Sequence, residues 1–321
     1  MLEYTPCYTA QHGLGGTIAA LSDHMQNPGL ILVNVSNGAI HEAPVSSCTW
    51  ASAPVISPDG SRVAFQGADG RLRAYDVRTR EEKAIGDPLP GLVSPRWAPS
   101  GEALMIETGG ATKLIDAVTG EEALAFEGLL ACWLGDGYRT LFVSRGALTR
   151  RDMATGDGAT ISADPGRIWG LAGSSDGARA AYIASGSGSI VLRILDTFTG
   201  NETEIGVSVD IWPWSLTWSP DGRRLAYCIG GEPQRWGQAV TVAVADIGRD
   251  GDIATQEATI ATDPRYAGLA WSPDSRAVAV AARVDGSGHY AVHAFEPGRG
   301  LCQLTETGNS VLPDWGPDAA M

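Results

Sequence analysis

The segment WSPDGRRLAY, from Trp218 to Tyr227, decides the fold because it recurs along the chain. The other copies align with it without gaps: ISPDGSRVAF from Ile56, WAPSGEALMI from Trp97, WLGDGYRTLF from Trp133, GSSDGARAAY from Gly173, WSPDSRAVAV from Trp271 and the shorter WGPDAAM from Trp315. From one copy to the next, the fourth position of the motif advances by 36 to 53 residues. Such a period is typical of repeat architectures, and it provides the four short strands of one β-propeller blade.

Each copy also predicts how its own strands run. The Ser-Pro-Asp-Gly stretch has the chemistry of a tight turn, and alternating apolar residues follow it, as in Arg62 to Phe65. This pattern predicts a strand A, a turn and a strand B. A second signature ends a strand on aspartate before another turn: YDVRTR, IDAVTG, RDMATG and LDTFTG, with Asp76, Asp116, Asp152 and Asp196. We interpret it as the hairpin between strands C and D.

The two ends of the sequence each hold part of a further blade. GTIAALSD from Gly16, LILVNVSNG from Leu30 and AIHEAPV from Ala39 have the patterns of strands B, C and D, with Asn34 at the aspartate position. VLPDWGPDAAM from Val311 has the pattern of a strand A. We therefore predict an all-β fold, a seven-bladed β-propeller of four-stranded antiparallel blades, closed by pairing the C-terminal strand with the N-terminal strands. A six-bladed ring is the alternative.

Composition agrees with a single propeller domain over residues 1–321. Forty-one glycines, 18 prolines and 44% hydrophobic residues describe a folded chain with many turns. The predicted blades start near residues 51, 92, 128, 168, 213 and 266, and the closing blade combines 311–321 with 14–47. The net charge of −14 disfavours nucleic acid as a partner, because its phosphates would be repelled.

Location and redox state follow from what the sequence contains. No stretch approaches the roughly 20 apolar residues of a membrane span, and the start MLEYTPCYTA lacks the basic and apolar regions of a secretory signal. We expect a cytoplasmic protein that does not bind membranes. The cysteines are scattered without metal-type spacing, and we expect buried reduced thiols at Cys7, Cys48, Cys132, Cys228 and Cys302.

The segments WSPDGRRLAY and WSPDSRAVAV resemble the repeats of the TolB-like propeller family, which is related in shape to WD-repeat proteins. The resemblance covers essentially the whole chain. It implies the propeller fold, but it does not imply one activity, since the family includes a periplasmic protein-binding component, propeller domains that gate peptidases and channel-mouth lyases. Because MLEYTPCYTA does not read as a signal peptide and the repeats occupy the chain, we expect it to differ from the periplasmic component and from the propellers that carry a peptidase domain.

Antiparallel strands divide the loops of a blade between two faces of the disc. The A–B and C–D turns lie on one face, the motif face, whereas the B–C loops and D–A crossings lie on the other, the crossing face. We interpret the motif aspartates as stabilising turns. The tryptophans that precede the motif turn are interpreted as packing between blades: Trp97, Trp133, Trp218, Trp271 and Trp315.

The crossing face holds the tryptophans and arginines that the repeat does not require. Because these residue types predominate at binding hot spots, we predict a ligand or partner site there, formed by Trp50, Arg145, Arg167, Trp169, Trp212, Trp214, Arg235, Trp236, Arg265 and Tyr266. Trp212 and Trp236 carry most of this argument. Trp169 and Trp214 share one offset from their motifs, so packing explains them as well as binding does.

Catalytic and metal motifs are weak. His24 and His289, with Asp285, are the candidates for acid–base chemistry on neighbouring B–C loops. DIGRDGDIATQE resembles a calcium loop with Asp246, Asp250, Asp252 and Glu257 as candidate ligands, but Gly248 at its third position removes one ligand. GSSDG at 173–177 matches the nucleophile-elbow pattern and coincides with the repeat, so we interpret it as a motif turn.

These observations favour a non-enzymatic binding or scaffold propeller over an enzyme. Its predicted partner is a protein segment or small ligand at the channel mouth, and no cofactor is predicted apart from the calcium alternative. The competing hypothesis is a lyase or hydrolase with its active site at the channel mouth of the same face. An enzyme needs titratable groups converging on one point, whereas a binding site needs an apolar anchor with a polar rim.

Overall fold

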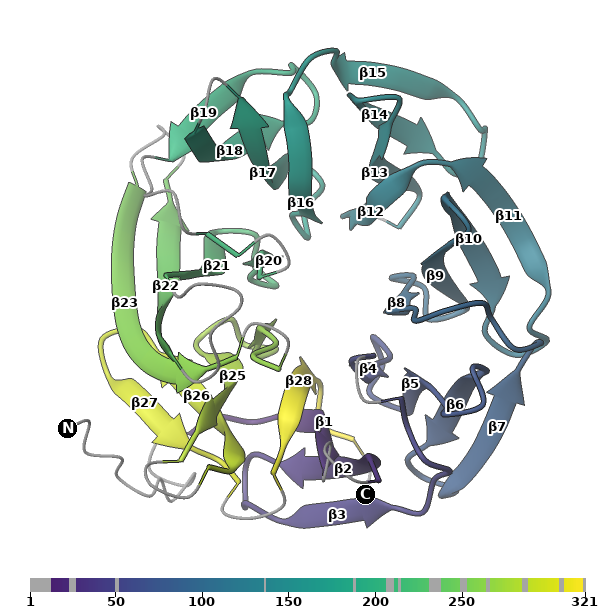
Figure 1. The fold of residues 1–321 in the computed structure, drawn as a ribbon, viewed down its shortest axis with the longest axis vertical. Helices are drawn as coiled ribbons and strands as arrows, with labels where there is room; N and C mark the ends of the chain where they lie inside the picture. Colours follow the sequence, from purple (N-terminus) through teal and green to yellow (C-terminus); the bar gives the residue numbers. More distant parts are fainter. Residues whose placement is uncertain are drawn as a thin grey trace.

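The computed structural model describes residues 13–22, 27–49, 52–135, 137–186, 189–205, 211–212, 215–230, 238–248, 253–263, 266–284, 288–305 and 309–319. Within these ranges the strands form seven four-stranded sheets, and every recorded strand pairing is antiparallel. Figure 1 shows the sheets arranged as a ring, with strands such as β4, β8 and β16 at the centre and β3, β7 and β11 on the rim. The predicted seven-bladed propeller is confirmed.

Six blades are continuous in sequence. Blade 1 comprises β4 (Val55–Ile56), β5 (Arg62–Gln66), β6 (Leu72–Asp76) and β7 (Glu81–Ile85). Blade 2 comprises β8 (Arg96–Trp97), β9 (Ala103–Thr108), β10 (Ala111–Asp116) and β11 (Glu122–Glu127). Blade 3 comprises β12 (Leu129–Leu134), β13 (Arg139–Ser144), β14 (Ala147–Asp152) and β15 (Gly158–Ser162). Blade 4 comprises β16 (Arg167–Gly173), β17 (Arg179–Gly186), β18 (Ser189–Asp196) and β19 (Glu202–Ile205). Blade 5 comprises β20 (Thr217–Trp218), β21 (Arg224–Ile229), β22 (Gln238–Ile247) and β23 (Ile253–Thr262). Blade 6 comprises β24 (Ala270–Trp271), β25 (Val278–Arg283), β26 (Tyr290–Glu296) and β27 (Gly300–Gln303).

Blade 7 joins the two ends of the sequence, as predicted. It consists of β28 (Val311–Gly316), β1 (Thr17–Ser22), β2 (Gly29–Asn34) and β3 (Ile40–Ala43), with β28 innermost and hydrogen-bonded to β1. Ile18 lies opposite Trp315, and the Trp315 indole donates to the Gly15 carbonyl at 3.0 Å. A strand A from one end therefore completes the B, C and D strands from the other, and blade 7 has the same four strands as the rest.

The motif turns are built by their serine and aspartate side chains. In blade 5 the Ser219 hydroxyl donates to Asp221 at 2.5 Å and accepts from the backbone N–H of Arg224 at 2.9 Å, while Asp221 accepts from the Arg223 N–H at 3.0 Å. The same contacts recur around Asp59, Asp176 and Asp274. The turn-stabilising role of these aspartates is confirmed, and the GSSDG segment is one such turn.

A feature that the sequence pattern did not reveal is an arginine–tryptophan clamp between blades. The arginine at the start of strand B stacks on the motif tryptophan of the next blade, at 4.8 Å for Arg62 over Trp97 and 5.3 Å for Arg179 over Trp218. Its guanidinium also donates to a carbonyl of the next motif turn, as from Arg179 to Gly222 at 2.7 Å. Arg224 and Trp271 repeat both contacts.

The tryptophans complete the clamp from their own side. Trp97, Trp218 and Trp271 donate their indole N–H groups to carbonyls of the preceding blade, at 3.0, 3.1 and 3.0 Å. A clamped junction thus combines a stacked cation with hydrogen bonds in both directions across the blade boundary. The predicted packing role of these three side chains is confirmed, since each is 4–8% exposed.

We expect Arg179→Ala to lower the free energy of unfolding by about 1–3 kcal/mol, because it removes the stack on Trp218 and the bonds to the Gly222 and Ile247 carbonyls. Urea denaturation measures the loss. Arg223→Ala is the matched control, because Arg223 is exposed next to Gly222 on the blade 5 turn that Arg179 contacts, and a change within about 0.5 kcal/mol is expected there. Equal losses in the two variants would contradict the clamp.

The cysteines follow the expectation only in part. Cys48, Cys132 and Cys228 are buried free thiols, and burial raises the pKa of each to about 12. Cys302 is disulfide-bonded, so the prediction of a reduced thiol is wrong for this residue. Cys7 lies outside the described residues. Disulfides form mainly in oxidising compartments, so the bond at Cys302 does not support the cytoplasmic location expected from the sequence. That location stays a prediction.

Candidate functional site

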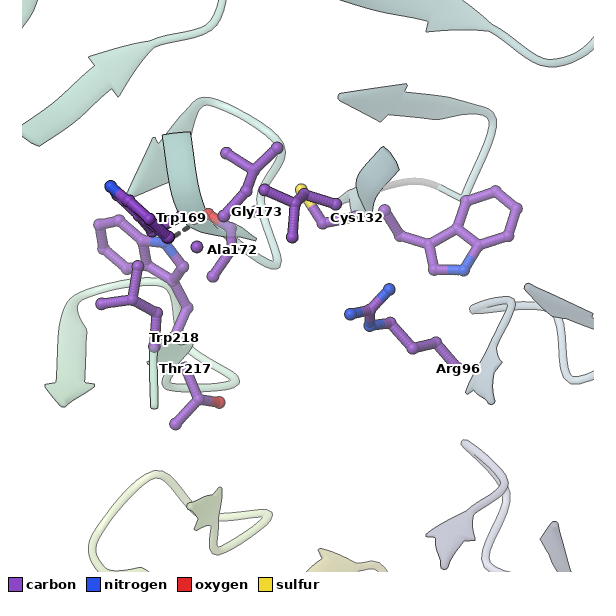
Figure 2. A pocket seen from close by; sticks show the side chains of 12 residues that line it. Arg96, Cys132, Trp169, Ala172, Gly173, Thr217 and Trp218 are labelled. Carbon is purple, nitrogen blue, oxygen red and sulfur yellow. Dashed lines mark hydrogen bonds between the residues drawn. The ribbon is translucent and has the colours of Figure 1, made fainter. Parts of the chain in front are cut away.

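A cavity of about 510 Å³ opens in the propeller channel beside blades 2 to 5. Its wall is made mainly of aromatic, aliphatic and small residues from the strands nearest the centre: Arg96, Leu130, Cys132, Trp133, Trp169, Gly170, Leu171, Ala172, Gly173, Leu216, Thr217 and Trp218. Figure 2 shows the Arg96 guanidinium reaching into the cavity from the side opposite Trp169 and Trp218. This volume lies within the usual range of small-molecule sites.

The blade repeat is interrupted at this cavity. Blade 2 has Ala103 where blades 1, 4 and 5 have the clamp arginine, so Trp133 in blade 3 has no such partner. Its indole N–H is buried without a hydrogen-bond partner, unlike that of Trp97 or Trp218. An unpaired buried donor costs about 1–3 kcal/mol. The junctions between blades 2 and 3 and between blades 3 and 4 therefore lack the complete clamp, and the clamp arginine is also absent from blade 6, which has Ala277 at this position.

Blade 4 departs from the repeat at the tryptophan position of the motif, whereas blade 2 departs from it at the arginine position. Blade 4 has Gly173 where the other complete blades have tryptophan or isoleucine, and a Cβ atom added there would lie 2.2 Å from the Trp133 carbonyl oxygen. Only glycine therefore permits this approach of β16 to β12. Both strands are bulged at the cavity, β12 between Leu129 and Cys132 and β16 between Ile168 and Gly170. Bulges of this kind re-aim side chains and are frequent beside binding sites.

Arg96 is fixed on the cavity wall by a small polar network. Its Nη1 atom donates to Glu107 at 3.1 Å and to the Ala131 carbonyl at 2.9 Å. Glu107 also accepts the backbone N–H groups of Leu130 and Ala131, each at 3.0 Å, and so holds the bulge of β12. Because both recorded contacts of Arg96 use Nη1 and its side chain is 43% exposed, the rest of the guanidinium remains accessible.

The channel continues toward the motif face, where a second cavity shares Arg96, Trp133 and Trp218 with the first and adds Asp314. Asp314 lies on β28 and accepts the backbone N–H of Ile56 at 2.7 Å. Burial raises the pKa of its carboxyl to about 6, although backbone hydrogen bonds act in the opposite direction. The channel thus holds an arginine and a carboxyl group that titrates near neutral pH.

The comparison with solved structures places this geometry among known propellers. The TolB protein of Acinetobacter baumannii is 17% identical, with 97% of this chain and 70% of that chain covered and a TM-score of 0.57. An oligogalacturonate lyase in complex with manganese is 13% identical (92% and 89% covered, TM-score 0.62), and a chain of the mitotic checkpoint complex is 15% identical (86% and 90% covered, TM-score 0.58). The chain has a TolB-like, WD-repeat-type propeller fold.

At these identities the likeness concerns the fold alone. No protein-family model and no curated protein matches the sequence. In the described part of this TolB-like propeller, no helix is long and apolar enough to cross a membrane, and no group of three or more histidine, cysteine, aspartate or glutamate side chains is placed to hold a metal ion.

Of the predicted crossing-face residues that the structure describes, Trp169 alone lines the cavity of this propeller. It is 39% exposed, its indole donates to the Ser185 hydroxyl at 3.1 Å, and Arg167 stacks on its ring at 3.9 Å. Arg145 is exposed on the loop between β13 and β14 and pairs with Glu127 at 3.4 Å. The structure therefore joins Arg167 to Trp169 but leaves Arg145 outside the cavity wall.

Two other candidates belong to the core, which corrects the expectation that they are surface anchors. Trp212 is 3% exposed and packs with Cys228 and Val280 in the cluster between blades 5 and 6. Tyr266 is 4% exposed and meets Tyr290 edge-on, with ring centroids 5.6 Å apart. Both lie in segments that read as loops in the sequence, but each loop folds its aromatic ring inward against apolar strands.

Many predicted residues lie outside the described ranges: Trp50, Trp214, Arg235, Trp236, Arg265, His24, Asp285, Asp250 and Asp252. His289 is described and exposed, but its two proposed partners are among the undescribed residues. The aromatic and acid–base hypotheses that depend on these residues stay predictions.

The calcium-like segment belongs largely to a long β-hairpin. Strands β22 and β23 pair as far as Ile247 opposite Ile253, which puts Asp246 opposite Ala254 and Glu257 opposite Ala243. The two carboxylates that a calcium loop needs together are thus three rungs apart, or roughly 10 Å along the strand. Asp246 instead lies 3.7 Å from the Arg224 guanidinium. The structure therefore does not bring Asp246 and Glu257, the two described members of this set, together.

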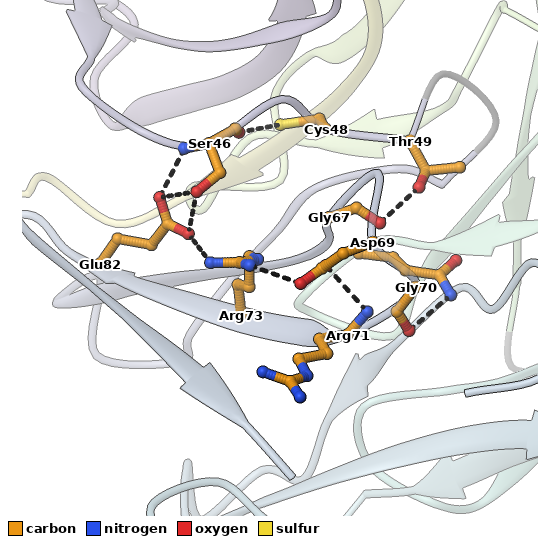
Figure 3. Close-up of polar contacts among 10 residues, drawn as sticks. Ser46, Cys48, Thr49, Gly67, Asp69, Gly70, Arg71, Arg73 and Glu82 are labelled. Atoms are coloured by element: carbon orange, nitrogen blue, oxygen red, sulfur yellow. Dashed lines mark hydrogen bonds and ion pairs between the residues drawn. The ribbon is translucent and has the colours of Figure 1, made fainter. Parts of the chain in front are cut away.

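A second polar cluster lies where the chain crosses from blade 7 to blade 1 (Figure 3). Glu82 accepts the backbone N–H of Ser46 at 2.6 Å and its hydroxyl at 2.8 Å, and it pairs with Arg73. Arg73 also binds Asp69 at 2.7 Å, a bond that lowers the pKa of the Asp69 carboxyl. These carboxylates are engaged by neighbouring donors, and the cluster fixes the crossing segment to blade 1.

Sequence reasoning missed Arg96 and assigned Trp133 and Trp218 to packing alone. The available signal was a break in the repeat: Ala103 replaces the arginine before Trp133, and Gly173 replaces the next tryptophan. Neither substitution looks functional by itself. Their significance depends on the clamp, which becomes visible only when neighbouring blades are placed side by side.

Asp314 gives this propeller a pH-dependent stability. Its pKa in the folded chain is about 6, above the ordinary 3.8, so the folded state holds the proton more tightly and stability falls as pH rises from about 4 to about 6. Asp314→Asn keeps an acceptor for Ile56 and removes the charge. At pH 8 we expect the free energy of unfolding of the variant to exceed that of the wild type by on the order of 1 kcal/mol. At pH 4 the two free energies should approach each other. A difference independent of pH would contradict this assignment.

Proposed function

We propose that the protein is a binding propeller that holds a ligand or a segment of a partner protein in the channel cavity beside blades 2 to 5. The observation that carries the proposal is the coincidence of the cavity with the interrupted clamp: Ala103 and Gly173 break the repeat where Trp133, Trp169 and Trp218 line open space. Departures from local structural rules concentrate at functional sites in natural proteins.

The chemistry of the cavity wall supports binding over catalysis. Three indole rings and several leucines provide an apolar anchor, and Arg96 provides one charged group beside it. This combination of tryptophan and arginine is the composition of binding hot spots. The similarity to TolB and to a chain of a multiprotein complex agrees with a binding role, since propellers of this shape include components of protein assemblies.

The proposal is tested with the neutral probe 2-(2-naphthyl)ethanol, titrated by calorimetry. We expect one site per chain, and Trp169→Ala should weaken binding about tenfold because it removes an exposed aromatic wall. Leu92→Ala, also a large exposed residue but not part of the cavity wall, is the matched control and should bind as the wild type does. Equal affinities in both variants would refute the proposal, and so would the absence of binding by every naphthalene in the series described below.

A channel-mouth lyase is the second candidate, and Asp314 is the observation that favours it. A carboxyl group with a pKa near 6 is suited to proton transfer at neutral pH, and one of the similar structures is an oligogalacturonate lyase in complex with manganese. Incubation with oligogalacturonate and manganese, followed by detection of unsaturated products, tests this candidate. Product formation that is lost in Asp314→Asn would replace the binding proposal.

A further inference from the structure

We propose that the occupant of the cavity beside blades 2 to 5 is an anion, a carboxylate carried next to an aromatic group; this inference rests on the binding function proposed above. The argument begins with charge. Among the described residues of the cavity wall, Arg96 is the charged side chain, and the others are aromatic, aliphatic, small or neutral polar. A cavity with one cationic group and apolar walls favours a ligand that carries the opposite charge on an apolar body.

The state of Arg96 strengthens this argument. Glu107 is shared among three donors, the Arg96 guanidinium and the backbone N–H groups of Leu130 and Ala131. Its negative charge is therefore partly satisfied by the bulged strand, and it engages only the Nη1 end of the arginine. The other end of the planar guanidinium group is therefore available to a second carboxylate, which arginine binds with two parallel N–H donors.

Among the described residues that line this cavity, none is a carboxylate. Burial raises the pKa of the Cys132 thiol to about 12, so this wall residue stays neutral. Asp314 lines the second cavity, toward the motif face, which Arg96 also borders, so a bound anion and the Asp314 carboxylate both lie on the Arg96 side of the channel. At the rim, Arg167 stacks on the Trp169 ring and adds a second positive charge beside the entrance. A site for an anion thus exists within a protein whose net charge is −14.

The indole rings define the remainder of the ligand. Trp169 and Trp218 lie across the cavity from Arg96, and Trp133 also contributes to the wall (Figure 2). Aromatic side chains gain from offset or edge contacts with another ring in addition to the area that they bury. A volume of about 510 Å³ accommodates a bicyclic aromatic acid without filling the channel.

A matched series of three naphthalenes tests the inference by calorimetry: 2-naphthylacetate, 2-(2-naphthyl)ethanol and 2-(2-naphthyl)ethylamine. We expect the carboxylate to bind at least about tenfold more tightly than the alcohol, and the ammonium compound to bind most weakly. Added sodium chloride should weaken the carboxylate more than the alcohol, since salt screens the guanidinium. Equal affinities for the carboxylate and the alcohol would overturn the inference while leaving the binding function intact, whereas no binding by any member would refute both.

Variants of Arg96 provide the second arm. Arg96→Gln should reduce the carboxylate-to-alcohol affinity ratio from about tenfold or more to about twofold, and Arg96→Lys should retain an intermediate ratio because it keeps the charge. A ratio that Arg96→Gln leaves unchanged would overturn the inference. A tripeptide ending in phenylalanine, with a free or an amidated terminus, separates a peptide carboxyl end from a free small acid as the source. If one of the variants fails to fold, the salt dependence of the wild type still decides the question.

Discussion

Deletion of residues 311–319 should lower the free energy of unfolding by at least about 3–5 kcal/mol, the scale of removing one large buried aromatic side chain. The deletion removes β28, and with it the buried Val311 and Trp315. It also removes bonds that cross the closure, including those from the Gly16 N–H to Asp318 at 2.9 Å and from the Ala319 N–H to Thr17 at 2.9 Å. Urea denaturation followed by circular dichroism measures the effect.

The control for this experiment is the single substitution Leu312→Ala. Leu312 belongs to the same strand but is only partly buried. Its truncation should therefore lower the free energy of unfolding much less than deletion of the strand does. An unfolding midpoint that survives the deletion unchanged would mean that blade 7 does not hold the ring closed, contrary to the pairing of β28 with β1.

Trp212→Ala should cost about 3–5 kcal/mol, because the side chain is 3% exposed and its removal leaves a cavity between blades 5 and 6. Trp169→Ala is the matched control, since the same substitution at a 39% exposed residue should cost about 1 kcal/mol or less. Thermal and chemical denaturation of both variants, with the titration described above, separates the core role of Trp212 from the binding role of Trp169.

The opposite order of stability for these two variants would contradict the assignment of Trp212 to the core and of Trp169 to the cavity wall. If Trp212→Ala keeps the wild-type stability and abolishes binding of the naphthalene probes, then Trp212 acts as a binding anchor, as its position in the sequence first indicated. If Trp169→Ala unfolds the protein, then the cavity wall is part of the core. In either case the assignment of these two tryptophans must be exchanged.

The fold could be predicted from the sequence because propeller blades repeat their chemistry. The turn aspartates and the strand A at Val311 without a blade of its own were enough to place seven blades and their closure. Even Asn34 behaves as its position in the repeat predicts, since its side chain accepts the Asn37 N–H at 3.2 Å in place of an aspartate. Local turn chemistry is recorded in consecutive residues, so a repeat makes it readable.

The candidate site could be predicted only in part. Trp169 is accessible, as a binding residue must be, and its binding role stays a prediction, whereas Trp212 and Tyr266 were chosen by the same argument and are buried. Whether a loop side chain turns inward depends on the apolar strands it meets, which are distant in sequence. Arg96 was missed because its role arises from the bulge of β12 and from Glu107, neither of which the sequence pattern indicates.

The closure of blade 7 has a consequence for the synthesis of the chain. The bond between Gly16 and Asp318 joins residues 302 positions apart, and β28 leaves the ribosome after all the other described strands. At the usual rates of translation, β1 waits roughly 15–60 s with one edge unpaired while the other blades emerge. An exposed strand edge is a template for pairing with other chains. The nascent polypeptide therefore carries a risk of aggregation at β1 until β28 has emerged and closed the ring.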